Sequence, residues 1–186
     1  MRLNKILKNA LLVISAGIIL TACATKKEVA VETPAAKEET KKEETKKEEV
    51  TKIEKIAGQM QGDVYVGTDS VKYLADGVAD RVFFATNESI LTTASRETLR
   101  AQAAWLRANS NITVVLEGHA DERGTREYNL ALGERRANAA KDYLMTYGIS
   151  SERITVLSYG KERPVDSGSN PLAWSKNRRS VTVKAN

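Results

Sequence analysis

The sequence predicts an α/β fold, an α+β sandwich in which helices pack on one mixed sheet. Two observations predict it. Apolar residues recur at helical spacing in two stretches, residues 92–109 and 125–147. Short runs rich in β-branched or aromatic residues flank both stretches. With 186 residues, the chain is long enough for one such domain with extra chain before it.

Residues 1–22 are typical of a secretory signal peptide. Arg2, Lys5 and Lys8 precede an apolar run over residues 10–22. As a helix this run would be roughly 20 Å long, too short for a hydrocarbon core of about 30 Å. The sequence therefore predicts a cleaved leader and not a spanning helix.

The leader ends in Leu20-Thr21-Ala22-Cys23, which resembles the lipobox of bacterial lipoproteins. The resemblance implies cleavage before Cys23, a diacylglycerol thioether on its sulfur and an N-acyl chain on its new amino terminus. Several acyl chains suffice for stable anchoring. Because Ala24 and not Asp follows the Cys, the resemblance implies the outer membrane of a diderm bacterium, facing the periplasm. The alternative is an ordinary signal peptide followed by a chance Cys.

The next segments precede the domain proper. Residues 23–56 hold nine Lys and nine Glu, with the near-repeat KEET-KKEET-KKEEV. Such a segment cannot bury enough apolar surface to order itself, so we expect a disordered tether. Fully stretched it would reach up to ~110 Å. Residues 57–79 are weakly patterned and are expected to be a weakly structured lead-in to the domain at residues 80–186.

The first half of the domain begins with the aromatic run at residues 81–85, predicted as a strand that ends at the polar Thr86-Asn87 pair. Thr92 or Thr93 can cap the first helix, which ends near residue 109. The β-branched run at 112–116 is the second strand, and it leads to Gly118.

The second half begins with the helix at 125–147, which Gly148 terminates because glycine suits the position after a helix. Its predicted apolar stripe includes Tyr128, Leu132, Ala139, Ala140, Tyr143, Leu144 and Tyr147. The runs at 154–159 and 180–184 are the third and fourth strands. This order of elements favours helices packed on a mixed sheet.

Composition excludes several kinds of site. The net charge is +5, and without the leader it falls to +2, so we expect no nucleic-acid partner. One Cys and one His rule out Cys₄ and Cys₂His₂ zinc sites. No Ser/His/Asp arrangement is suggested, so we expect no catalytic residue, no metal and no cofactor besides the lipid on Cys23. His119 is expected to bond the backbone of its loop, the alternative being a metal ligand or general base.

Two charged residues are the main candidates for ligand binding. Arg136 falls within or beside the apolar stripe of the second helix, where an unpaired guanidinium would be costly. Asp121 lies in the loop after the second strand, where sheet–helix folds place ligands. Both could face one cleft. Two alternatives remain: the residues pair with each other, or Asp121 caps the following helix.

Trp105 and the residues near the C-terminus carry weaker hypotheses. Trp105 is expected in the core and Trp174 in a polar loop, and either could stack on a ligand. The basic run Asn177-Arg178-Arg179 could bind a polyanion, although stabilisation of a loop or a cleft rim is favoured.

Several motifs, in order, resemble the OmpA-like domain family and, within it, the peptidoglycan-associated lipoproteins. The resemblance covers residues 80–186. The matching motifs are Gly118-His119-Ala120-Asp121-Glu122-Arg123-Gly124-Thr125, Tyr128-Asn129, Leu132-Gly133-Glu134-Arg135-Arg136-Ala137, Ser158-Tyr159-Gly160-Lys161-Glu162-Arg163-Pro164 and Ser175-Lys176-Asn177-Arg178-Arg179.

The resemblance implies noncovalent binding of the peptidoglycan stem peptide through its diaminopimelate residue. Arg136 would grip the side-chain carboxylate and Asp121 would accept from the ammonium. Asn129 would orient the loop or bond the peptide, and Thr86 and Asn87 would line the pocket. Arg136→Ala is expected to abolish this binding and leave the domain folded.

One departure from the family pattern concerns charge. Many relatives carry an acidic residue at the position of Ala85 or Asn87, and this sequence has neither. An amide can hydrogen-bond to the ammonium but adds no negative charge.

The resemblance also implies a role for the whole protein. It would be a non-enzymatic tether between outer membrane and cell wall, part of a Tol-Pal system in envelope integrity and cell division, with a TolB-like periplasmic propeller as partner. The alternatives are a cell-wall module of another envelope machine and, less favoured, a peptidoglycan hydrolase.

Overall fold

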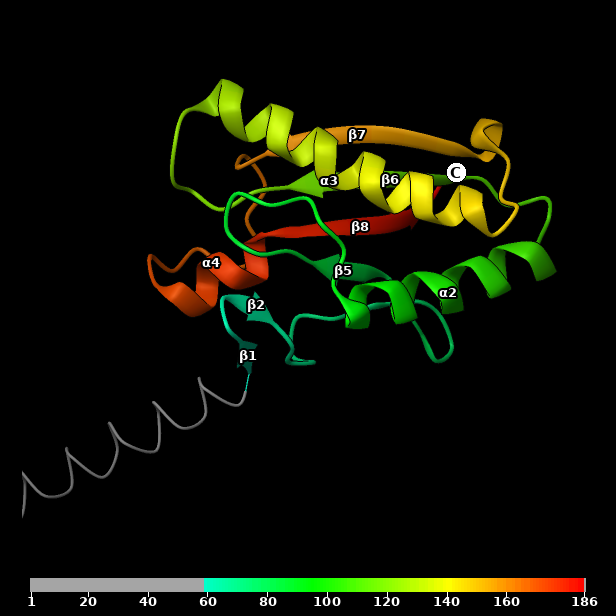
Figure 1. Cartoon of the computed structure of the whole chain (residues 1–186), viewed down its shortest axis with the longest axis horizontal. Helices are drawn as coiled ribbons and strands as arrows, with labels where there is room; N and C mark the ends of the chain where they lie inside the picture. Colours follow the sequence, from blue (N-terminus) through cyan, green and yellow to red (C-terminus); the bar gives the residue numbers. More distant parts are fainter. Residues whose placement is uncertain (1–58, 186) are drawn as a thin grey trace, which may run out of the picture. The chain divides into compact units, whose positions relative to one another are not determined.

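The computed structural model describes residues 59–185 and confirms helices packed on one mixed sheet (Figure 1). The predicted signal peptide, Cys23 and the tether lie outside the described residues. Within residues 59–185, no helix is both long and apolar enough to cross a membrane.

The sheet has the strand order β5-β8-β6-β7. β6 and β7 run parallel, whereas β8 is antiparallel to both β5 and β6. The start of β8 therefore lies next to the ends of β5 and β6, although these segments are far apart in the sequence. The strands are β5 (Arg81–Phe83), β6 (Val114–His119), β7 (Ile154–Gly160) and β8 (Arg179–Lys184).

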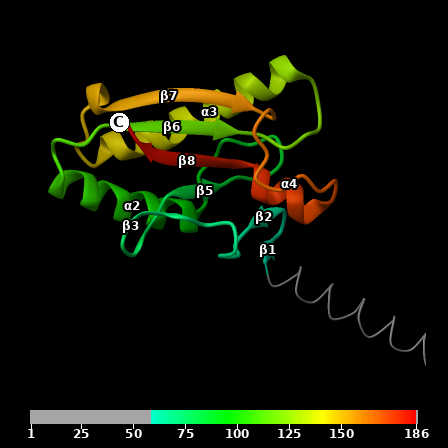
Figure 2. The same ribbon diagram turned by 180° about the vertical axis from the view of Figure 1, so that it is seen from behind.

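Helices α2 (Thr93–Ala108) and α3 (Arg126–Thr146) cover one face of the sheet, and the strands stand in front of them in the reverse view (Figure 2). Thr92 caps α2, because its side chain accepts a hydrogen bond from Ser95 N at 3.1 Å. Thr125 caps α3 in the same way. The hypothesis that Asp121 caps this helix is therefore wrong. Gly148 follows α3 with a φ of +84°, as its predicted role requires.

A short helix, α4 (Pro171–Asn177), was not predicted. Asn170 caps it, and Pro171 occupies its first turn, where a missing N–H costs nothing. The interpretation of Trp174 as a loop residue is wrong, because Trp174 lies in α4. Trp105, by contrast, packs against the core as expected.

The face that α3 buries is turned relative to the predicted stripe. Leu132, Ala140 and Leu144 are buried as predicted, but Tyr128 is 44% exposed. The buried positions also include polar and small residues that a search for large apolar side chains overlooks: Asn129, Gly133, Arg136 and Ala137.

Two glycines let α3 lie directly on β6. A Cβ on Gly118 would overlap the carbonyl of Gly133, and a Cβ on Gly133 would lie 2.8 Å from the carbonyl oxygen of Gly118. This close approach sets the depth of Arg136, which is three residues beyond Gly133 on α3.

The lead-in has more regular structure than the sequence pattern predicts. It forms two short hairpins, β1 (Met60–Gln61) with β2 (Val64–Tyr65) and β3 (Tyr73–Ala75) with β4 (Val78–Ala79). Tyr65 is 2% exposed and lies edge-on to the ring of Phe83, 4.7 Å between centroids. This contact fixes the first hairpin to β5.

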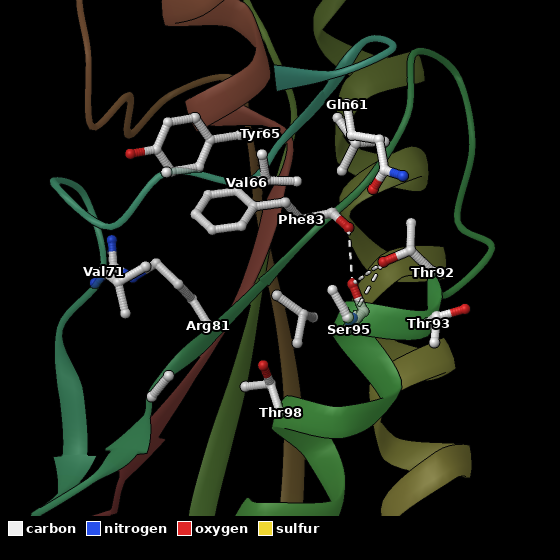
Figure 3. Close-up of a pocket in the computed structure, with 15 residues that line it drawn as sticks. Gln61, Tyr65, Val66, Val71, Arg81, Phe83, Thr92, Thr93, Ser95 and Thr98 are labelled. Atoms are coloured by element: carbon white, nitrogen blue, oxygen red, sulfur yellow. Dashed lines mark hydrogen bonds between the residues drawn. The ribbon is translucent and has the colours of Figure 1, made fainter. Parts of the chain in front are cut away.

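A groove of about 520 Å³ runs between α2, the lead-in and β5 (Figure 3). Ser95 Oγ donates to the carbonyl of Phe83 at 3.0 Å, and Gln102 Nε2 donates to that of Ala79 at 2.7 Å. These bonds occupy carbonyls that an edge strand would otherwise offer to another chain. Arg81 is the one charged residue lining the groove, and it pairs with Asp80. None of the predicted ligand-binding residues lies here.

Candidate functional site

The predicted ligand-binding loop, residues 120–125, connects the end of β6 to the start of α3. Asp121 is buried in it, with 7% of its surface exposed. Its Oδ1 accepts from the backbone N–H and Nε of Arg123, both at 3.1 Å. Its Oδ2 accepts from Arg123 Nη2 at 2.7 Å and from Arg178 Nη1 at 3.3 Å. The carboxylate thus makes four hydrogen bonds, about as many as it has lone pairs.

These contacts keep Asp121 ionised. Burial alone would raise its pKa, but the hydrogen bonds from Arg123 and Arg178 and the charge of Arg123 outweigh that effect and lower the pKa below the ordinary value. Asp121 therefore carries its negative charge at neutral pH.

Arg178 is a site residue whose role the sequence did not specify beyond its basic run. It is 2% exposed and precedes β8, so it lies at the ends of both β5 and β6. Its Nε donates to the carbonyl of Phe84 at 3.1 Å. Its Nη2 donates to the carbonyl of Asp63, in the turn between β1 and β2, and lies 3.9 Å from that residue's carboxylate. Stabilisation of the loop, the favoured hypothesis for this run, agrees with these contacts.

Arg136 does not pair with Asp121 directly. It has no exposed surface and donates to three backbone carbonyls, those of Glu88 at 2.8 Å, His119 at 2.8 Å and Ala85 at 3.0 Å. The guanidinium thereby joins the segment after β5 to the end of β6. Removing it would take a hydrogen bond from three carbonyls, of which that of Ala85 keeps the N–H of Glu88 at 3.2 Å. We therefore expect Arg136→Ala to destabilise the domain, whereas the sequence predicts a variant that stays folded.

The charge of Arg136 is not neutralised locally. Among residues 59–185, no carboxylate lies within 4.0 Å of it. Burial first, and then the charge of Arg178, lower its pKa to about 10, so it stays protonated at neutral pH. A buried positive charge with carbonyl partners only favours the approach of an anion.

Three side chains from outside the loop hold it in place. Asn129 is 2% exposed, and its Nδ2 donates to the carbonyl of Arg123 at 2.8 Å. Lys161 Nζ donates to the carbonyl of Gly124 at 2.8 Å. Trp174 Nε1 donates to Glu122 Oε1 at 2.8 Å, and the guanidinium of Arg123 lies 4.4 Å from the centre of its indole ring. Asn129 is expected to orient the loop or to bond the peptide, and its contact with the carbonyl of Arg123 fits the first of these roles.

A cleft of about 490 Å³ opens beside this loop, lined by Thr86, Asn87, Asp121, Arg123, Gly124, Thr125 and Tyr128. Three predicted site residues, Thr86, Asn87 and Asp121, therefore meet at one cleft. Arg136 and Asn129 are not among the lining residues and support the loop from within the fold.

The far side of the cleft is the segment after β5. Asn87 has a φ of +58°, a left-handed conformation that asparagine tolerates better than most residues. The N–H of Thr86 donates to Asp63 Oδ2 at 2.6 Å. Asp63 is a contact that no sequence signal predicts, because it lies in the weakly patterned lead-in.

His119 departs from its predicted role. Neither ring nitrogen has a hydrogen-bond partner in the described part of the chain, so the expected bond to the loop backbone is wrong. The ring stacks on Tyr159 with centroids 5.5 Å apart. Burial, followed by the charges of Arg179, Arg81 and Arg163, lowers its pKa to about 3. Within residues 59–185, no group of three or more His, Cys, Asp or Glu could hold a metal.

Comparison with known sequences gives one consistent family. The OmpA family profile matches residues 83–178. The peptidoglycan-associated lipoprotein of Mesorhizobium japonicum is 52% identical over 106 residues, which are 57% of this chain and 63% of that protein. That of Pasteurella multocida is 40% identical over 131 residues, 70% of this chain and 83% of that protein. The match to the first of these spans less than two thirds of the relative's length.

Solved structures with a similar fold include a member of the same group of proteins. The peptidoglycan-associated lipoprotein from Burkholderia pseudomallei has a TM-score of 0.56 at 33% identity, covering 57% of this chain and 90% of that one. The C-terminal domain of Helicobacter pylori MotB has a TM-score of 0.54 over 57% of this chain and 84% of that one, but at 16% identity this likeness concerns the fold alone.

Proposed function

The chain belongs to the OmpA family, and on that basis we propose that it is a peptidoglycan-associated lipoprotein of the bacterial envelope whose folded domain binds the peptidoglycan stem peptide noncovalently. The observation that carries the proposal is the cleft at the end of β6. A charged Asp121 lines this cleft, and the buried, protonated Arg136, which has no carboxylate partner within residues 59–185, supports the loop from within the fold.

The ligand's chemistry fits these charges. The side chain of diaminopimelate ends in a carboxylate and an ammonium on one carbon. The carboxylate would be drawn by the charge of Arg136, and the ammonium by that of Asp121. Thr86 and Asn87 would contact the peptide at the cleft wall, and Asn129 would keep the loop in shape. Because Arg123 now covers Asp121, the incoming ammonium would share this carboxylate with the guanidinium.

The remaining parts of the chain would make the domain a tether. Acyl chains on Cys23 would anchor it in the outer membrane, facing the periplasm, and the Lys/Glu-rich segment would span the distance to the wall. In this arrangement the protein would belong to a Tol-Pal system in envelope integrity and cell division, with a TolB-like propeller as partner. The names of its relatives support the lipoprotein assignment, and the Tol partner rests on family resemblance.

We do not favour the alternatives. A cell-wall module of another machine would be suggested by the MotB likeness, but that similarity concerns the fold alone. A peptidoglycan hydrolase would need a catalytic acid, nucleophile or metal. In the described cleft the single acid, Asp121, is held ionised by two arginines, which makes it a poor proton donor.

Sedimentation with purified sacculi tests the proposal. The chain from residue 23, with Cys23→Ser so that it stays soluble, should pellet with sacculi and release no soluble fragments. Asp121→Asn removes the charge with little change in shape and should pellet far less. Asp142→Asn, on an exposed part of α3, is the matched control and should behave as wild type. Equal pelleting of the Asp121 variant and the control would contradict the proposed site, and fragment release would indicate a hydrolase.

A further inference from the structure

The cleft has few free hydrogen-bond acceptors for an ammonium group, and a further acceptor lies outside the loop at residues 120–125. Asp121 is already bonded to four donors, so it has little left to offer a ligand without losing one of them. Positions 85 and 87, after the end of β5, hold Ala and Asn and add no negative charge to the cleft wall. An ammonium that shares Asp121 with Arg123 would therefore be held more firmly by a second carboxylate.

Asp63 has that capacity. Its carboxylate accepts one hydrogen bond, from the N–H of Thr86 at 2.6 Å, and half of its side chain is exposed. The nearest cation in the described chain is Arg178, whose Nη2 is 3.9 Å from Oδ2, beyond hydrogen-bond distance. At least two lone pairs of this carboxylate remain open to solvent or a ligand.

The position of Asp63 is fixed from both ends of its hairpin. Gly62, with a φ of +62°, makes the turn between β1 and β2. Tyr65, in β2, packs on Phe83, and Phe83 is three residues before Thr86 in the sequence. The carbonyl of Asp63 accepts from Arg178, the same guanidinium that bonds Asp121. One arginine therefore links the two aspartates across the end of the sheet, and Thr86, a lining residue of the cleft, donates its N–H to Asp63, so this carboxylate lies one hydrogen bond from the cleft wall.

We propose that Asp63 is a specificity-determining residue of the cleft and accepts the side-chain ammonium of the stem peptide. The proposal rests on the proposed function and names a residue that the OmpA family match, which begins at residue 83, does not include. The lead-in hairpin is thereby part of the binding site and not only a connection to the tether.

Two peptides and three proteins test it by calorimetric titration. One peptide is a stem peptide with diaminopimelate, and the other carries 2-aminopimelate, which keeps the terminal carboxylate and lacks the ammonium. The proteins are the soluble chain from residue 23, its Asp63→Asn variant and the control Asp76→Asn. Asp76 is an exposed carboxylate of the same lead-in. The amide oxygen that Asp63→Asn introduces can still accept from Thr86 N–H, so the hairpin should stay docked, and thermal unfolding checks this.

We expect Asp63→Asn to weaken binding of the diaminopimelate peptide about tenfold, the size of one charge-assisted hydrogen bond, and to leave the 2-aminopimelate peptide unchanged. Asp76→Asn should change neither. Equal weakening of both peptides would show that Asp63 only positions the wall and would overturn the proposal. So would unchanged binding of both. Wild type that binds neither peptide would overturn the proposed function itself.

Discussion

Replacing Arg136 by Met should destabilise the domain strongly, because the buried guanidinium links the segment after β5 to the end of β6 through three backbone carbonyls. Met retains much of the side-chain volume, so the change removes the donors and the charge and leaves no large cavity. The carbonyls of Ala85, Glu88 and His119 each lose one donor, and that of Ala85 keeps the N–H of Glu88 at 3.2 Å.

The expected loss follows from how buried each carbonyl bond is. The bond to His119 is fully buried, and an unpaired carbonyl there costs about 2 kcal/mol. The bonds to Glu88 and Ala85 are partly buried, so water can replace the donor and each loss costs about 1 kcal/mol. Together this is about 4 kcal/mol, a large part of a typical stability of about 5–15 kcal/mol.

Urea unfolding at neutral pH measures this loss as a shift of the midpoint at constant slope. Arg135→Met is the matched control, because Arg135 is the adjacent residue on α3 and is exposed. We expect a change of less than about 0.5 kcal/mol there. A loss below about 1 kcal/mol for Arg136→Met would refute the reasoning that its three carbonyl bonds hold the loop to the sheet.

Three further predictions concern other parts of the site. Gly133→Ala should cost about 1–3 kcal/mol, since its Cβ would press on the Gly118 carbonyl; a more stable variant in urea unfolding would contradict the close approach of α3 and β6. The pKa of His119 is about 3 in the folded domain, below its value in the unfolded chain, so the unfolded chain binds the proton more readily. The free energy of unfolding should therefore be highest above about pH 6.5 and fall as the pH drops, by up to about 1.4 kcal/mol per pH unit. His119→Phe should flatten the profile between about pH 6.5 and 5, and an unchanged slope would count against a neutral buried imidazole. Asn129→Ala should loosen the loop, which faster exchange of its amide hydrogens would report, with α3 itself still protected.

The elements of the fold were predictable where one signal decided them. Thr92 and Thr125 cap helices whose spacing is regular, and Gly148 stops the second helix. α4 was missed because its seven residues are too few for an apolar pattern to show a helical period.

The site was predictable only in part, because its contacts join distant segments. Asp121 and Thr86 do meet at the cleft, and local sequence placed each at the end of a strand. The sequence indicated that Arg136 must find a partner, but it could not show that backbone carbonyls would satisfy it. The contact of Asp63 with Arg178 spans 115 positions and depends on how β8 inserts between β5 and β6, which no local pattern reports.

Titration of the isotope-labelled chain with a diaminopimelate stem peptide, followed by amide chemical shifts, tests the central claim most directly. We predict saturable changes concentrated at Thr86, Asn87, Asp121 and Gly124, around the cleft at the end of β6. Saturable changes confined to the groove beside β5, around Val64 and Thr98, would contradict the proposed site. The absence of any change at millimolar peptide would contradict peptidoglycan binding by this domain.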